Sequence, residues 1–279
     1  MRTPTLLVPA VLCAALPAAA QFQPPQPSSA ASFSQRIGLT DVSISYSRPN
    51  VKGRAIWGAL VPWDKPWRTG ANQATTITFS DEVSVQGQKL AAGTYALVTI
   101  PGKDEWTVIF NRDTKLWFET EYDAGKDVLR VKAKPVAADP SETFTLRFLS
   151  VDTASAVLAI EWEKLRVPVT IGVEIDAKVR RSVAEAKADD WQTPLGAARY
   201  WFDQKKNRAE AWQWLEKSIG IKRTYANVAR KARVLAEEGK LTEAVKAGEE
   251  ALALAKADPA KPNMAAFEKA VGDWKAKAK

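Results

Sequence analysis

The sequence predicts an α+β protein, in which an antiparallel β-sandwich is followed by an α-helical region of tetratricopeptide-like hairpins. Three observations lead to this fold class. Residues 37–175 contain short apolar runs with a period of two, the spacing of a strand with one buried face. From residue 176 the apolar period lengthens to about 3.6, the spacing of an amphipathic helix. The helical part also resembles itself when it is shifted by about 33 residues.

Nine runs in the first part have strand character: 42–47, 74–79, 83–90, 94–101, 105–111, 127–136, 143–151, 156–163 and 165–175. In TFTLRFL, for example, Phe144 and Leu146 share one face and Thr145 lies on the other. The runs are separated by turn-forming stretches such as QGQK, PGKDE and DTAS, with no helical crossover between them. This pattern favours an antiparallel sandwich, although a barrel would produce the same pattern.

Six segments of the second part have helical periodicity: 176–187, 193–204, 209–220, 224–239, 241–257 and 263–277. In the repeat, AEAWQWLEKSI (209–219) lies over TEAVKAGEEAL (242–252), and residues 232–259 resemble a tetratricopeptide hairpin. Each hairpin must first bury its own apolar stripe. We therefore favour helices that pack on one another or on the sandwich over helices that form a peptide-binding groove.

The chain begins with the features of a secretory signal peptide. Arg2 precedes an apolar run that is too short to span a bilayer, and Ala18 and Ala20 predict cleavage near Ala20. The predicted organisation is a signal peptide (1–20), a flexible Pro/Ser-rich leader (21–34), a β-sandwich domain (35–175) and a helical region (176–279). We expect an exported protein, periplasmic or secreted, without a transmembrane segment.

Composition excludes several kinds of chemistry. The chain has no histidine, and its one cysteine, Cys13, lies within the predicted signal peptide. A Ser-His-Asp triad, a cysteine nucleophile, a disulfide in the mature chain and a His/Cys zinc site are therefore ruled out. We predict no catalytic residues, no metal and no cofactor. An oxygen-only site for a hard cation, and an enzyme that works with carboxylates, remain open alternatives.

The net charge of +8 is unevenly distributed along the chain. Residues 21–175 carry 17 basic and 17 acidic side chains, whereas residues 176–279 carry 22 and 15. The basicity of the protein therefore belongs to the predicted helices. Their charges alternate in sign, as on solvated helix faces, which disfavours nucleic acid as a partner.

One segment, residues 48–72, differs from the strands on either side of it, and we call it the basic-aromatic loop. It has no periodicity, and loops of its length are uncommon in compact domains. Its five cations against the single Asp64 give it a charge of +4 in an otherwise acidic domain. The candidate ligand-binding residues are Arg48, Lys52, Arg54, Trp57, Lys65, Trp67, Arg68 and Asn72.

These residue types suit an anionic or carbohydrate ligand. Arginine presents a planar fork for carboxylate or phosphate, lysine a compact charge, and tryptophan a face on which a sugar ring can stack. A structural interpretation competes with this one. The tryptophans would plug the open end of the sandwich, Asn72 would be a turn residue, and the arginines would pair with carboxylates such as Asp81, Glu82, Glu105 or Asp113.

The stretch RPNVKGRAIWGALVPWDKPWRTGANQATTITF, followed by GTYALVTIPGKDEWTVIFN, resembles the bacterial family catalogued as domain of unknown function 2911. The motifs RP-x-x-KGR and WRTGAN carry the resemblance, which we expect to extend over the whole mature chain. The resemblance implies an exported bacterial protein with a β-rich domain and a tetratricopeptide-like C-terminal part. The matching positions are Arg48, Pro49, Lys52, Gly53, Arg54, Trp57, Gly58, Trp67, Arg68, Thr69, Gly70, Ala71 and Asn72.

Three functions remain in competition. The first is an exported, non-catalytic binding protein that holds an anionic small molecule or a glycan at the basic-aromatic loop. The second is a scaffold that binds a protein through an exposed apolar helical face. It would lose that surface if Trp201, Trp212, Trp214 and Leu235 were buried. The third is a hydrolase that uses a carboxylate pair such as Asp104 with Glu105, or Glu119 with Glu121.

Overall fold

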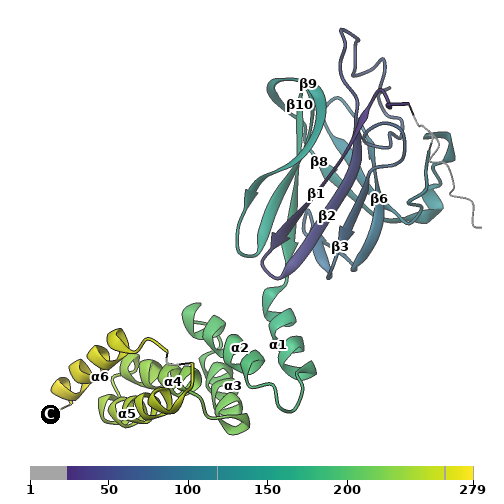
Figure 1. Cartoon of the computed structure of the whole chain (residues 1–279). Coiled ribbons are helices and arrows are strands. Elements are labelled where there is room, and N and C mark those ends of the chain that lie inside the picture. The colour runs from purple at the N-terminus through teal and green to yellow at the C-terminus, as the bar shows by residue number, and fades with distance from the viewer. Residues whose placement is uncertain (1–23, 118, 261, 279) are drawn as a thin grey trace, which may run out of the picture.

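The computed structural model describes residues 24–117, 119–260 and 262–278 of the chain. Two antiparallel sheets are followed by six helices, which confirms the predicted fold class (Figure 1). The predicted signal peptide (1–20) and residues 21–23 of the predicted leader lie outside the described residues. Within the described ranges, no helix is both long enough and apolar enough to cross a membrane.

The two sheets have six and four strands. The first has the order β1 (Ser29–Ile37), β2 (Thr40–Arg48), β3 (Thr76–Phe79), β6 (Gly93–Ile100), β7 (Trp106–Asn111) and β8 (Asp127–Ala133). The second has the order β5 (Gln88–Leu90), β4 (Val83–Val85), β10 (Ser155–Val173) and β9 (Val136–Val151). Every pairing between the described strands is antiparallel, as expected for strands joined by close turns.

Alternation along the strands builds the core of the sandwich. In β2, Val42, Ile44 and Tyr46 are buried, while Ser43 and Ser45 between them are exposed. Ile44 lies opposite Ile77 of β3, and the Tyr46 hydroxyl reaches across to the backbone of Leu146 in β9. Apolar side chains of both sheets thus form one continuous core.

Three strands differ from the prediction. β1 begins at Ser29, inside the segment predicted as a flexible leader, because Phe33 packs edge-on against Tyr46 and Phe148. The run 83–90 is a hairpin of two short strands. The runs 156–163 and 165–175 belong to one long strand, β10, which continues through an irregularity at Glu163, where φ is 55°.

The six predicted helical segments all form helices: α1 (Ile175–Glu185), α2 (Gln192–Asp203), α3 (Arg208–Ile221), α4 (Tyr225–Glu237), α5 (Leu241–Ala257) and α6 (Ala265–Lys277). Consecutive helices pack together, most extensively α2 with α3 and α4 with α5. Small residues allow close approach. A Cβ added to Gly248 would lie 2.6 Å from Val271, so glycine is required where α5 meets α6.

The helices and the basic-aromatic loop lie at opposite ends of the sandwich (Figure 1). α1 follows directly on β10, and its Lys178 ammonium contacts Asp81 and the carbonyl of Leu39, beside the β1–β2 turn. Ile175 packs against Gly38 of the same turn. The loop starts at Arg48, at the far end of β2.

Candidate functional site

The first residues of the basic-aromatic loop form backbone hydrogen bonds with β9 of the second sheet. Asn50 forms an isolated bridge with Thr143, the Phe144 amide donates to the Pro49 carbonyl at 2.9 Å, and the Val51 amide donates to the Glu142 carbonyl at 2.8 Å. The loop is therefore ordered from its first residues.

Its second half is joined to the first sheet. Trp67 and Thr99 of β6 exchange two backbone hydrogen bonds of 2.7 and 2.8 Å, and the Asp64 amide donates to the Pro101 carbonyl at 2.8 Å. The loop thus crosses the open end of the sandwich from β9 to β6. Its two halves form walls anchored to different sheets.

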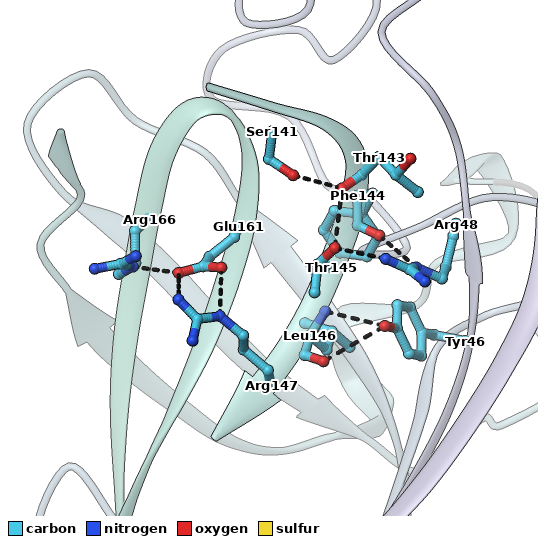
Figure 2. A network of polar contacts seen from close by, with 10 residues as sticks. All are labelled: Tyr46, Arg48, Ser141, Thr143, Phe144, Thr145, Leu146, Arg147, Glu161 and Arg166. Atoms are coloured by element: carbon cyan, nitrogen blue, oxygen red, sulfur yellow. Dashed lines mark hydrogen bonds and ion pairs between the residues drawn. The ribbon is translucent and has the colours of Figure 1, made fainter. Parts of the chain in front are cut away.

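Arg48 clamps β2 to β9, as Figure 2 shows. Its Nε donates to the Phe144 carbonyl at 3.1 Å and its Nη2 to the Thr145 hydroxyl at 2.8 Å. Next to it, the Tyr46 hydroxyl is bonded to the Leu146 backbone. Arg48 is not among the described residues that line the cavity between the two walls. Among the predicted binding residues, Arg48 therefore has a structural role.

The loop's indoles form the plug that the structural interpretation expects. The Trp57 ring centroid lies between 5.0 and 6.4 Å from those of Trp63, Trp67, Trp106 and Trp162. Aromatic pairs at such distances stabilise a core beyond the area they bury. Trp57 and Trp67 therefore hold the loop in place.

Backbone strain is concentrated in this segment. Lys52, Asp64, Thr69 and Asn72 are four of the eight described non-glycine residues with positive φ. Thr69 is the most unusual of the four because β-branched residues rarely adopt such angles, and its hydroxyl donates to the Trp67 carbonyl at 3.3 Å. Strain of this kind persists only where the surroundings enforce it, and it gathers at functional sites.

A cavity of about 600 Å³ lies between the two walls, a size typical of small-molecule sites. Four cations line it: Lys52, Arg54, Lys65 and Arg68. Four prolines also line it: Pro27, Pro49, Pro62 and Pro66. Trp67 and Trp162 contribute to its wall as well. None of its described lining residues is a carboxylate.

Two of these cations are held by contacts that involve the main chain. The Lys52 amide donates to the Glu142 carboxylate at 2.8 Å, which fixes the main chain and leaves the side chain exposed. The Arg54 guanidinium donates to the carbonyls of Val51 and Asn50. Within the described residues, Lys52, Arg54 and Lys65 form no ion pair.

Asn72 holds the segment that precedes β1 in place. Its Nδ2 donates to the Ser28 carbonyl at 3.0 Å and to the Ser47 hydroxyl at 3.3 Å, and its φ is 57°. The turn residue of the structural interpretation is thus also an anchor, because it holds the segment that carries Pro27 and Ser28 against the cavity. Asn72 itself is not among the described lining residues.

Comparison with protein families finds a match that covers most of the sandwich. A profile of the family described as "Protein of unknown function (DUF2911)" matches residues 28–171, more than half of the chain. The chain belongs to this family. The match contains both halves of the loop and ends before α1, so the helical region, to which we expected the resemblance to extend, lies outside it. No curated protein and no solved structure matches the chain.

The carboxylates expected as arginine partners in this DUF2911 protein pair with lysines outside the loop instead. The pairs are Asp81 with Lys178, Glu82 with Lys89, Glu105 with Lys132 and Asp113 with Lys126. The structure therefore separates the two interpretations of the loop by residue type. Its indoles serve as a plug, whereas Lys52, Arg54, Lys65 and Arg68 line a cavity.

Of the carboxylate pairs considered for a hydrolase, only Asp104 with Glu105 has both side chains among the described residues. Asp104 and Glu105 are both exposed in the β6–β7 turn, and the Glu119 side chain lies outside the described residues. Glu161 is the buried carboxylate of Figure 2, held by Arg147 and Arg166. Burial raises its pKa, but hydrogen bonds from the two arginines outweigh burial and leave the pKa below its usual value. The described residues contain no group of acidic side chains that could hold a metal ion.

The helices of this family member bury the aromatic residues that a scaffold would need. Trp201, Trp214 and Leu235 are buried. Trp212 is half-buried, and its Nε1 donates to Glu238 at 2.9 Å. These four side chains therefore serve to pack the helices.

Several cavity residues escaped sequence analysis. Pro27 and Ser28 were assigned to the leader, and Trp162 belongs to a strand far along the chain. The alternation of AIEWE does place Trp162 on the apolar face of β10, but no local pattern aims it at the loop.

Proposed function

We propose that this protein is an exported, non-catalytic binding protein whose cavity at the basic-aromatic loop holds an anionic ligand, such as a small-molecule anion or an acidic glycan. The observation that carries the proposal is the cavity of about 600 Å³ lined by Lys52, Arg54, Lys65 and Arg68, of which Lys52, Arg54 and Lys65 form no ion pair within the described residues. The binding residues are these four cations. Arg48, Trp57, Trp67 and Asn72 hold the walls in position.

Electrostatics supports an anion as the occupant. Like charges gathered at one surface repel each other, and an anion placed among them relieves that repulsion while accepting charge-assisted hydrogen bonds. Lys52 and Lys65 are exposed, and extending toward a ligand would not require either of them to give up a carboxylate.

The proposal includes export and a bacterial origin. Support for export comes from the apolar run and the small-residue pattern before Ala20. We also propose that the helices are tetratricopeptide-like, with α2–α3 and α4–α5 as successive hairpins about 33 residues apart. Secretion of the full-length chain with a new N-terminus at Gln21, found by N-terminal sequencing, tests the export part.

Isothermal titration of the mature chain against inorganic phosphate and glucuronate at low salt tests the binding part. We expect at least one of these anions to bind, and to bind more than tenfold more weakly to the double variant Lys52→Ala/Lys65→Ala. Lys246→Ala, an exposed lysine on α5, is the matched control and should bind as the parent does. The absence of heat from these anions, and from the alkyl carboxylates used below, with correctly folded protein would refute the proposal.

A further inference from the structure

We infer that the ligand is an amphiphilic anion, with a carboxylate, sulfonate or phosphate head on an alkyl or aryl body, and is not a carbohydrate. The inference rests on the proposed function and specifies the class of ligand. It follows from three properties of the cavity: the kind of hydrogen-bonding group it offers, the covering of its indole faces and the apolar character of the remaining wall.

The charged side chains that line the cavity offer hydrogen-bond donors, and three of its oxygen acceptors are already engaged. Lysine and arginine donate but cannot accept. The Asn50 amide oxygen already accepts from the Thr143 hydroxyl at 2.7 Å, and the Asn50 carbonyl accepts from Arg54. The Gly70 carbonyl accepts from Trp67 Nε1 at 3.1 Å. Sugar hydroxyls each carry a hydrogen that needs an acceptor, whereas an oxyanion only accepts, so the cavity suits an oxyanion.

The indoles of the cavity have no free face. Trp67 is 5% exposed and Trp162 1% exposed, and their rings are stacked on each other with centroids 5.9 Å apart. Phe144 lies 5.2 Å from Trp67 as well. Carbohydrate recognition by tryptophan uses an open ring face. These two rings can provide only apolar contact to a ligand that lies beside them.

The remaining wall is apolar and solvent-exposed. Leu60 is 45% exposed at the cavity, and Pro62 and Pro66 line it nearby. Proline and leucine side chains gain from contact with hydrocarbon and offer no hydrogen bond to a sugar. A ligand with an apolar body would cover this surface while its head remains among the cations.

A series of straight-chain carboxylates from acetate to decanoate, kept below micelle-forming concentrations, tests the inference by titration against the mature chain. Each buried methylene contributes about fourfold in affinity. We therefore expect octanoate to bind more than tenfold more tightly than acetate, phosphate or glucuronate. The variant Lys52→Ala/Lys65→Ala should weaken octanoate binding more than tenfold.

Two leucines provide a matched test of the wall. Leu60→Ser should reduce octanoate affinity severalfold and leave acetate or phosphate affinity unchanged. Leu39, which is 44% exposed in the β1–β2 turn at the other end of the sandwich, is its control, and Leu39→Ser should change neither affinity. Both side chains are exposed, so both variants should fold.

The outcomes separate the inference from the proposal on which it rests. Phosphate or glucuronate that binds as tightly as octanoate, without dependence on chain length, would overturn the inference and leave the anion-binding function standing. Octanoate binding that Leu39→Ser and Leu60→Ser reduce equally would also overturn it, because the alkyl chain would then not lie in this cavity. No binding of any anion to folded protein would reject both.

Discussion

The helical region and the basic-aromatic loop are both rich in cations, but the two regions differ in how these cations are paired with carboxylates. In the helices, several arginines form ion pairs with carboxylates, as in Arg208 with Glu238 at 2.8 Å and Arg223 with Glu250 at 2.7 Å. In the loop, Lys52 and Lys65 have no such partner among the described residues. Most of the protein's positive charge therefore lies away from the cavity. The pairing of individual charges, more than the net charge of a region, indicates where an anion can bind.

The largest expected effect on stability comes from the tryptophan plug that holds the loop in place. Trp67→Ala should lower the free energy of unfolding by about 3–5 kcal/mol, because it leaves a cavity among four aromatic rings. Urea denaturation followed by circular dichroism measures the effect. Trp117→Ala is the control. Trp117 is 44% exposed, and its loss should change stability by less than about 0.5 kcal/mol.

A result of less than about 1 kcal/mol for Trp67→Ala would show that the sandwich does not need the loop. The loop would then be an appendage, and the rigid walls on which the proposed cavity depends would have no support.

Arg48 distinguishes a clamp from a binding residue. Arg48→Ala should destabilise the protein by about 1–3 kcal/mol, because the Phe144 carbonyl and the Thr145 hydroxyl lose a charged donor. Phosphate or octanoate affinity, measured at a temperature where the variant is folded, should change by less than threefold. Unchanged stability with a large loss of affinity would restore Arg48 to the ligand, as the sequence suggested.

The periodicities predicted most of the fold because they follow local rules. Six helices and most strands reflect spacings that a few neighbouring residues determine. β1 was missed because its small serines resemble a linker, and only the distant partners Tyr46 and Phe148 make Phe33 a core residue. Sequence alone cannot reveal contacts between segments more than a hundred residues apart.

The same limit applied to the site. Composition singled out the loop's cations and tryptophans, and their residue types were informative. Which of them would face a cavity depended on where β9 and β6 anchor the two walls, and this is a property of the tertiary structure. Arg48 and Arg54 look alike in the sequence. Arg48 donates to β9, whereas Arg54 donates to the carbonyls of Val51 and Asn50 and lines the cavity.

The pairing of helical charges predicts a dependence of stability on pH. Burial raises the pKa of Glu238, but hydrogen bonds from Trp212, Lys240 and Arg208 outweigh burial and lower it from 4.5 to about 2. A carboxyl whose pKa is depressed by folding stabilises the protein above its unfolded pKa. That contribution is lost as the pH falls from about 4.5 toward 2.

Glu238→Gln should therefore be less stable than the parent near neutral pH, and the difference should shrink below pH 4.5. Urea midpoints at pH 6, 4 and 3 measure this difference. A constant difference across the three pH values would mean that Glu238 contributes through its shape and neutral hydrogen bonds, and that its charge is not matched as the comparison claims.

The smallest expected effect on stability comes from two exposed lysines, one on a helix and one at the cavity. Comparing these two lysines tests directly whether an ion pair distinguishes the helices from the loop. Lys275 forms an ion pair with Glu249 at 2.8 Å on the surface of α6, and exposed pairs of this kind contribute little. Lys52 has no ion pair but lines the cavity. Lys275→Ala and Lys52→Ala should each change the free energy of unfolding by less than about 1 kcal/mol. Only Lys52→Ala should weaken the binding of phosphate or octanoate, because of these two lysines only Lys52 lines the cavity. Equal binding of the anion by the two variants would contradict this prediction. It would mean that the unpaired Lys52 contributes no more to anion binding than the paired Lys275 does.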